Sequence, residues 1–380
     1  MERRKRTLVR IPIRSLILAV AISAFPAGGS HVSAADDGVA SGGLDPTRVM
    51  GARACLNCHP SESLALIHSA HSAAHLKLRG AAANKYAEAL GLKKPASEST
   101  ACVKCHATPR TTFTGNVQVI SGVSCESCHG ESGGENGWLN AHAVYGPNGS
   151  TPESETEEHR TARLARIDKA GMVRSNHIAK LASKCFGCHT VTNAALVNAG
   201  HKLGQSEDGF ELVGRTIGEV RHNFHLDQST NDPDGPTLWA KRDGRDTAAR
   251  RRIKFLVGIL TDAQIAFATL SQIEDEEVLE SEFAEQVFGR AEAPLEYLEV
   301  AIEALEDDVP EQLETAFEML EEGLDAGYED EEGREALAEA AEGLDELVKW
   351  FATQDGKGLD ALDDVLEELV EPKGTPYERK

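Results

Sequence analysis

The sequence predicts a mainly α-helical protein with two different halves. The N-terminal half should consist of short helices and loops, because it has few long periodic runs of apolar residues and contains all eight cysteines of the chain. From about residue 247 onward, apolar residues recur with three- and four-residue spacing, which is typical of amphipathic helices. The chain of 380 residues is long enough for two or three domains. We expect boundaries at 1–34, 35–236 and 237–380.

The C-terminal part should be a bundle of about five antiparallel helices. Each expected helix carries one apolar stripe. The stripes are Leu295, Leu298, Ile302 and Leu305; Leu313, Phe317, Leu320 and Leu324; Leu344, Leu347 and Phe351; and Leu359, Leu362, Leu366 and Leu369. Pro310 suits the first position of a helix, and Gly323 is expected to mark a break between helices. This bundle contains no Cys or His.

The negative charge of the protein is concentrated in this bundle. The net charge is −23, and residues 261–370 hold 36 acidic and 4 basic side chains. Residues 35–260 are nearly balanced, with 26 basic and 23 acidic side chains. Because phosphate binding depends on Lys and Arg, this distribution disfavours nucleic acid and anionic membranes as partners. The acidic faces could instead bind a basic protein, or they could serve only for solubility or oligomerisation.

The N-terminal segment 1–34 has the three regions of a secretory signal peptide. Six basic residues precede an apolar stretch, Ser15 to Phe25, and Val32-Ser33-Ala34 provides a small-residue cleavage site. This stretch is too short to cross a bilayer, although an uncleaved anchor is the alternative. No later segment is expected to be long and apolar enough to cross a membrane. The mature protein should be periplasmic or otherwise exported.

All eight cysteines belong to four copies of one motif, C-x-x-C-H. The copies are Cys55-Leu56-Asn57-Cys58-His59, Cys102-Val103-Lys104-Cys105-His106, Cys125-Glu126-Ser127-Cys128-His129 and Cys185-Phe186-Gly187-Cys188-His189. This is the attachment signature of c-type haem. The two thiols add to the two vinyl groups of one porphyrin, and the adjacent His ligates the iron. The pattern predicts four covalent haems, with the short helices and loops of this half wrapped around them.

Two other readings of the cysteines are weaker. Four C-x-x-C pairs could form two four-thiolate zinc sites, or they could be redox dithiols or disulfides in an oxidising compartment. Neither reading explains why His follows the second Cys in every copy. Export also favours haem, because c-type haem is attached outside the cytoplasm in bacteria.

The second axial ligands are expected to be histidines. Nine remain outside the motifs and the signal segment: His68, His71, His75, His142, His159, His177, His201, His222 and His225. Met50 and Met172 are the only methionines of the haem half. Because Met ligation raises the reduction potential, this scarcity favours bis-His ligation and low potentials.

Spacing selects among these histidines. Three of them follow a motif His at nearly the same offset, which is 12 for His71 after His59, 13 for His142 after His129 and 12 for His201 after His189. The corresponding segment after His106, 107–118, contains no His. The iron at His106 is therefore the candidate for an open or remotely supplied sixth position, although no catalytic residues can be assigned around it.

Other histidines are expected to have structural or surface roles. His68, His71 and His75 have the spacing of one helix face, so one should be a ligand and the others propionate partners or exposed. His159 follows the acidic segment 153–158 and should be solvated. Seven basic residues, Lys241, Arg242, Arg245, Arg250, Arg251, Arg252 and Lys254, could neutralise propionates or the acidic bundle, or be an ordinary solvated helix start.

The chain resembles the cytochrome c554 family of tetrahaem electron carriers over roughly residues 51–230. Three features carry the resemblance: the stretch from Cys55 to Ala74, the run Gly122-Val123-Ser124-Cys125-Glu126-Ser127-Cys128-His129-Gly130, and the pair His222 and His225 after the fourth motif. The run around the third motif is the more telling, because C-x-x-C-H alone is shared by many cytochromes.

The resemblance implies a crossed set of ligands. His71 would bind the iron of His129, and His142 the iron of His59. The second haem, at His106, would be five-coordinate, and His222 or His225 would serve the fourth. His201 departs from the family pattern, and so puts in doubt both the ligand of the fourth haem and the vacancy at the second.

Three functions follow as alternatives. An electron carrier would have partners that resemble hydroxylamine oxidoreductase or a quinone-linked cytochrome, as the family resemblance implies. A haem enzyme could reduce nitric oxide, nitrite or hydroxylamine at an open iron beside His106. A binding module would use the acidic bundle to tether the haems to a larger complex.

Overall fold

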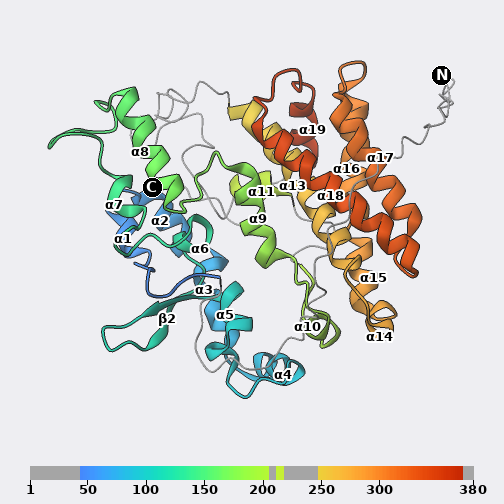
Figure 1. Ribbon diagram of the computed structural model, residues 1–380, viewed down its shortest axis with the longest axis horizontal. Helices are drawn as coiled ribbons and strands as arrows, with labels where there is room; N and C mark the ends of the chain where they lie inside the picture. The colour runs from blue at the N-terminus through green and yellow to red at the C-terminus, as the bar shows by residue number, and fades with distance from the viewer. Residues whose placement is uncertain (1–42, 205–210, 218–246, 371–380) are drawn as a thin grey trace, which may run out of the picture. The chain divides into compact units, whose positions relative to one another are not determined.

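The computed structural model describes residues 43–204, 211–217 and 247–370, which are mainly helical as predicted (Figure 1). The expected signal segment, residues 1–34, lies outside the described residues, and so does the expected domain boundary at 236. Both remain predictions.

The N-terminal half consists of short helices joined by loops, as expected. They are α1 (Arg53–Leu56), α2 (Pro60–Ile67), α3 (Ala70–Ala73), η1 (Ala74–Leu78), α4 (Ala81–Ala89), η2 (Ala96–Glu98), α5 (Thr100–His106), α6 (Cys125–His129), α7 (Leu139–His142), α8 (Glu157–Lys169), α9 (Ile178–His189), α10 (Ala194–Asn198) and α11 (Leu212–Ile217). The longest of them, α8, has 13 residues.

A β-hairpin that the sequence analysis did not predict joins the second motif to the third. Strand β1 (Thr108–Thr111) pairs antiparallel with β2 (Val117–Ser121), and Thr111 lies opposite Val117. Strand β1 begins two residues after His106, and β2 ends four residues before Cys125. The hairpin therefore returns the chain so that the third motif starts near the end of the second.

The C-terminal half contains seven helices among the described residues, rather than the expected five. They are α13 (Thr247–Leu270), α14 (Glu276–Leu279), α15 (Glu282–Gly289), α16 (Glu292–Leu305), α17 (Glu311–Ala326), α18 (Glu331–Thr353) and α19 (Leu362–Leu369). The predicted stripes are confirmed as core positions, since Leu298, Leu320 and Leu344 are fully buried, whereas the terminal Leu369 is exposed. Gly323 lies inside α17 rather than between helices, and a Cβ there would lie 2.6 Å from the Phe267 ring.

Helix α13 is the central helix of this half. It packs most extensively on α18 and also on α9, α11, α15 and α16. By length and composition, its segment Ala248–Leu270 is long and apolar enough to cross a membrane. The expectation that no segment after the signal has these properties is therefore wrong. Because 78% of its most apolar window is buried inside the protein, the structure accounts for it as a core helix.

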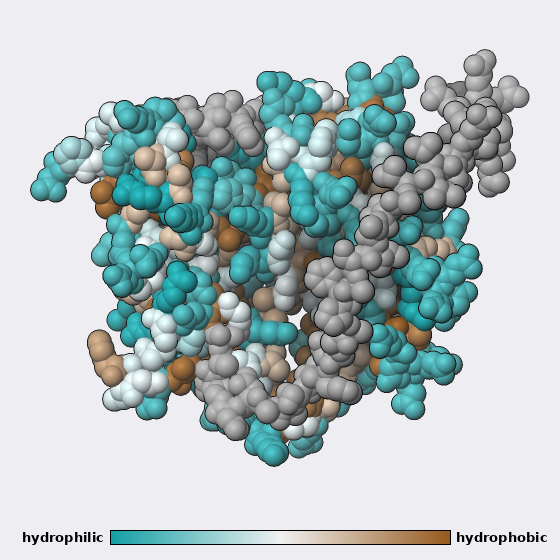
Figure 2. Space-filling model, viewed as in Figure 1, coloured by the Kyte–Doolittle hydropathy of each residue, from teal (hydrophilic) through white to brown (hydrophobic). Residues whose placement is uncertain are grey.

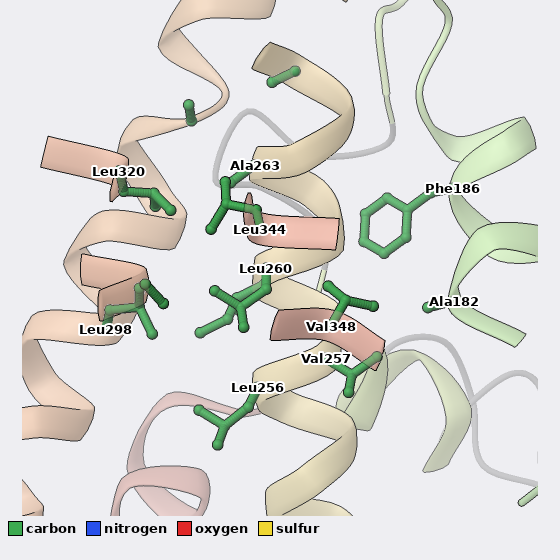
Figure 3. Close-up of a cluster of buried hydrophobic side chains, with 14 of the residues drawn as sticks. Ala182, Phe186, Leu256, Val257, Leu260, Ala263, Leu298, Leu320, Leu344 and Val348 are labelled. Carbon is green, nitrogen blue, oxygen red and sulfur yellow. The ribbon is translucent and has the colours of Figure 1, made fainter. Parts of the chain in front are cut away.

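Helix α9, which carries the fourth C-x-x-C-H motif, belongs to the same hydrophobic core as the bundle. Ala182 and Phe186 of α9 lie against one side of α13, and Leu298 and Leu320 lie on its other side (Figure 3). Phe186 is fully buried. This residue, which lies between the two cysteines of the fourth motif, thus anchors that motif to the C-terminal helices.

The basic residues at the start of α13 are not a solvated helix start. Arg250, Arg252 and Lys254 are buried. The guanidinium of Arg252 donates to the carboxylates of Asp360 and Asp363 near α19, and the Arg252–Asp360 distance is 2.8 Å. Arg252 therefore neutralises part of the acidic bundle, as one reading of this segment proposed. Lys241, Arg242 and Arg245 lie outside the described residues.

The N-terminal half has a much smaller apolar core of its own. Its cluster consists of Leu78, Ala83, Ala87, Ala96, Val103 and Ala107. Of the ten exposed large apolar side chains among the described residues, seven lie between positions 50 and 144: Met50, Leu56, Leu64, Ile67, Leu76, Phe113 and Val144. In the view of Figure 2, hydrophilic side chains cover most of the described surface, with brown apolar residues between them. The polypeptide of this half therefore leaves apolar positions that a large apolar group could cover.

Candidate haem sites

Each C-x-x-C-H motif is built on a short helical turn. The second motif ends α5, the third forms the whole of α6, and the fourth ends α9. In the first, Cys55 lies in α1 and His59 immediately precedes α2. In α5, α6 and α9 the second Cys and the His follow the first Cys at positions i+3 and i+4, so helical geometry places all three side chains on one face. That face can present two thiols and one imidazole to a single porphyrin.

Side-chain contacts join the four motifs in two pairs, and α6 of the third motif also packs on α9 of the fourth. The thiol of Cys55 lies beside that of Cys125, which joins the first motif to the third. The second and fourth motifs make reciprocal contacts, in which the Cys105 sulfur is 3.9 Å from the Gly187 carbonyl oxygen and the Cys188 sulfur is 3.8 Å from that of Lys104. All eight cysteines lie in the described ranges and none forms a disulfide.

Three imidazole pairs bring motif histidines against other histidines. The ring centroids are 5.9 Å apart for His59 and His142, 6.3 Å for His106 and His201, and 5.7 Å for His71 and His189. Two imidazoles on opposite sides of one metal ion have centroids about 6 Å apart, because each metal–nitrogen bond is about 2.0 Å long. These separations therefore fit the ligation of an iron between the rings.

At two of the candidate ligands a backbone carbonyl fixes the ring nitrogen that would not face a metal. Nδ1 of His129 is 2.7 Å from the Val173 carbonyl oxygen, and Nδ1 of His201 is 2.8 Å from that of Lys202. An N–H donated from Nδ1 to a carbonyl leaves Nε2 unprotonated and available to a metal, which is the usual support of a metal-bound His.

Burial keeps two of the candidate ligands, His142 and His189, neutral. Desolvation, aided by the neighbouring His59, lowers the pKa of His142 to about 4. Desolvation, aided by His71, lowers the pKa of His189 to about 3. Neutral imidazoles have the lone pair that iron ligation needs, so these rings are competent ligands at pH 7.

The third motif is held by a buried carboxylate that the sequence analysis did not single out. Glu126 is fully buried and accepts hydrogen bonds from the backbone N–H groups of Met50, Gly51 and Ser132 and from the Ser132 hydroxyl. These contacts tie the motif to the segment that leads into the first motif. Four donors satisfy a charged oxygen pair that burial would otherwise make costly.

The residues before the third motif explain the run Gly122 to Gly130. A Cβ on Gly122 would lie 2.4 Å from the backbone oxygens of His71 and Ser72, so only glycine permits this approach. Val123 N–H donates to the His71 carbonyl over 2.9 Å, and Ser124 and Ser127 form a capping box at the start of α6. The third motif is thereby attached to the backbone of a candidate ligand.

The predicted distal ligands have different outcomes. His142 lies beside His59, as the crossed arrangement requires, and His201 lies beside His106, where an open position was expected. The described ring neighbour of His71 is His189, whereas the resemblance assigned His71 to the iron of His129. His222 and His225 lie outside the described residues. The ligand assignments therefore remain predictions.

Two other expectations about histidines are wrong. His68, His71 and His75 do not share one helix face, because α2 ends at Ile67 and the backbone of Ser69 is extended before α3. His159 is half-buried rather than solvated, and its Nδ1 lies 2.8 Å from the Glu155 carboxylate. That contact makes His159 part of an ion-pair network.

The residues present fit c-type haem better than zinc. Among the described residues, no group of three or more His, Cys, Asp or Glu side chains is arranged to hold a metal ion by itself. A structural zinc site needs four ligands around one point, which no group of described side chains provides. Paired thiols with an adjacent imidazole, an opposed imidazole and exposed apolar side chains nearby are what a covalently attached porphyrin requires.

Comparison with known proteins supports this reading of the N-terminal half. Neither a curated protein nor a solved structure matches the chain significantly. A family model does match residues 54–130, which include the first three motifs but neither the fourth motif nor His142 and His201. Over these residues the chain is similar to the family described as cytochrome c554 and c-prime.

Proposed function

We propose that the protein is an exported tetrahaem c-type cytochrome that transfers electrons between redox partners through an array of low-potential haems. The family match supports c-type haem and electron transfer. The number of haems rests on the four complete C-x-x-C-H motifs. The observation that carries the proposal is that these motifs meet in two pairs, with other histidines opposed to His59, His106 and His189 at 5.9, 6.3 and 5.7 Å.

The protein's own residues would hold each haem. The two cysteines of a motif would attach the porphyrin and the motif His would ligate its iron, and a second His lies beside the motif His at His59, His106 and His189. Each bound haem supplies a one-electron iron couple. The contacts between Cys105 and the fourth motif, and between Cys55 and Cys125, would keep neighbouring haems close enough for electron exchange.

The proposed ligand set also explains why the potentials should be low. His ligands on both faces of the iron favour the oxidised state relative to a Met/His pair. Met172 and Met50 are the only methionines of this half, and no described contact places either beside a motif His. We therefore expect all four haems to titrate at low potential.

Export and partners are part of the proposal. The signal-like N-terminus supports a periplasmic or otherwise exported protein, in agreement with the c554-like segment. The donor and acceptor would be other redox proteins, resembling hydroxylamine oxidoreductase or a quinone-linked cytochrome. A basic protein surface could dock on the acidic bundle, where acidic side chains far outnumber basic ones.

The alternative is a haem enzyme that reduces nitric oxide, nitrite or hydroxylamine. That reaction needs an iron with an open position, and only the iron at His106 was a candidate. The ring of His201 beside His106 weighs against this alternative.

Counting the haems tests the proposed function. The protein would be expressed with its own signal in a bacterium that matures c-type cytochromes. Intact mass and the alkaline pyridine haemochrome spectrum should both give four haems per mature chain. Replacing both cysteines of the second motif, Cys102→Ser with Cys105→Ser, should leave three. Protein that is exported but carries no tetrapyrrole would overturn the proposal.

A potentiometric titration then addresses electron transfer. Absorbance at the α band should change over a broad range of low potentials, because four interacting haems titrate at different values. A single high-potential transition would contradict a bis-His array.

A further inference from the structure

We infer that His201 is the second axial ligand of the iron at His106, so that the second haem of this protein has no open position. The inference rests on the proposed function and assigns a ligand at one of its four sites. It differs from what the c554 resemblance implies, which is a five-coordinate iron at this haem.

The distance and angle between the two rings fit shared ligation. Their centroids are 6.3 Å apart, close to the value of about 6 Å for two imidazoles on opposite sides of one metal. The ring planes are 84° apart, so the two imidazoles are nearly perpendicular. His59 and His142 have a similar separation of 5.9 Å but are inclined by only 31°.

His201 is held in place by its surroundings. Its Nδ1 lies 2.8 Å from the Lys202 carbonyl oxygen, which leaves Nε2 for a metal. The Tyr86 ring packs edge-on against the imidazole at 5.1 Å, and the Tyr86 hydroxyl donates to the Gly200 carbonyl over 3.0 Å. Helix α4, which contains Tyr86, therefore fixes the loop after α10 against the second motif.

The two pairs of motifs repeat the same arrangement. In the pair formed by the first and third motifs, His142 follows the later motif in the sequence and reaches the motif His of the earlier one, His59. In the pair formed by the second and fourth motifs, His201 follows the later motif at almost the same spacing and reaches His106. His201, which corresponds to His142 of the other pair, therefore occupies the position that the family leaves open.

A saturated iron at His106 has a consequence for function. Iron with two imidazole ligands cannot bind a small molecule unless a ligand leaves. The second haem would then relay electrons like the others, and the reduction of small nitrogen oxides at this site would be excluded.

Spectroscopy of the full-length holoprotein tests the assignment. EPR of the oxidised wild type should include a low-spin signal of the strongly anisotropic kind that perpendicular imidazoles give. The second haem should bind no carbon monoxide, so the reduced wild type and Cys102→Ser with Cys105→Ser, which lacks this haem, should bind equal amounts per chain. In His201→Ala one further iron should become high-spin, one further equivalent of carbon monoxide should bind per chain, and added imidazole should restore the wild-type spectrum.

His68→Ala is the matched control, because His68 is exposed at the end of α2. It should retain the wild-type spectra. More carbon monoxide bound by the wild type than by Cys102→Ser with Cys105→Ser would overturn the inference, and that comparison stands even if His201→Ala fails to mature. An unchanged spectrum in His201→Ala with four haems attached would also overturn it. A haem count below four would instead contradict the proposed function.

Discussion

The guanidinium of Arg163 donates a hydrogen bond to the backbone carbonyl oxygen of His142 over 3.0 Å. The other edge of the same guanidinium forms a two-point contact with the buried carboxylate of Glu155, with both nitrogen–oxygen distances at 2.7 Å. Arg163 lies in α8 and His142 ends α7. A candidate axial ligand is thus positioned by an ion pair on the next helix.

Arg163→Met should destabilise the protein and loosen His142. Breaking a buried pair leaves Glu155 charged without its partner, which typically costs about 3–5 kcal/mol. Chemical denaturation measures this loss, and the EPR signal of the haem at His59 should broaden in the same variant. Arg160→Met on the same helix is the control, since the partner of Arg160, Glu157, is 76% exposed and such a pair contributes at most about 1 kcal/mol. Equal losses in the two variants would contradict the role given to Arg163.

Acid should weaken the same contact. The Arg163 guanidinium, and then His159, lower the pKa of Glu155 to about 2. A carboxyl whose pKa is lower in the folded than in the unfolded state contributes stability that is complete above about pH 4.5 and is lost as the pH falls toward 2. Glu155→Gln should be less stable than wild type at pH 6, and the difference should shrink by pH 3. Melting temperatures of both proteins across this range test it, and a constant difference would count against the prediction.

Gly122→Ala should disturb the third motif. The added Cβ would fall 2.4 Å from the backbone oxygens of His71 and Ser72, and backbone atoms cannot move aside cheaply. We expect a loss of about 1–3 kcal/mol in unfolding free energy, as is typical of overpacking, together with an altered spectrum for the haem at His129. Gly187→Ala in the fourth motif is the matched control, because a Cβ there would meet no neighbouring atom within 4 Å and alanine favours helix. Comparable destabilisation by both variants would refute the argument from close approach.

Periodicity was enough to predict the helical stripes around Leu298 and Leu320, because each depends on residues close in sequence. The contact of α9 with α13 was not predictable in this way, since nothing near Phe186 in the sequence specifies its distant neighbours. The same holds for Glu126, whose donors come from Met50, Gly51 and Ser132. A glutamate between two motif cysteines has no local signal that distinguishes a buried acceptor from a solvated side chain.

The helix face expected for His68, His71 and His75 fails for a local reason. Spacing alone does not reveal that Ser69 adopts an extended backbone and donates its hydroxyl to the Leu66 carbonyl oxygen. These two features end α2. The role of His201 as a ligand could be suspected from its spacing after the fourth motif. Its partner could not be read from the sequence, because the second and fourth motifs lie far apart along the chain and meet only through the fold.

Lys254 should make the stability of the protein depend on pH in the alkaline range. It is 1% exposed in α13, its amine donates to the Thr216 hydroxyl over 3.1 Å, and burial lowers its pKa to about 7. Between pH 7 and about 10 the unfolded chain binds a proton that the folded protein does not, so this lysine makes stability rise with pH. Below pH 7 the folded protein must carry the buried charge, and the penalty is complete.

Lys254→Met should therefore be more stable than wild type at pH 6.5, with the advantage shrinking by pH 9.5. Denaturant midpoints of both proteins at the two pH values measure this advantage. Comparing the variant with wild type at each pH cancels the titration of all other groups. Lys180→Met on the exposed face of α9 provides the control. At both pH values it should change the unfolding free energy by no more than about 0.5 kcal/mol. A Lys254→Met protein that is less stable at pH 6.5 would mean that the ammonium group is stabilised by its surroundings, and that burial does not dominate its energetics.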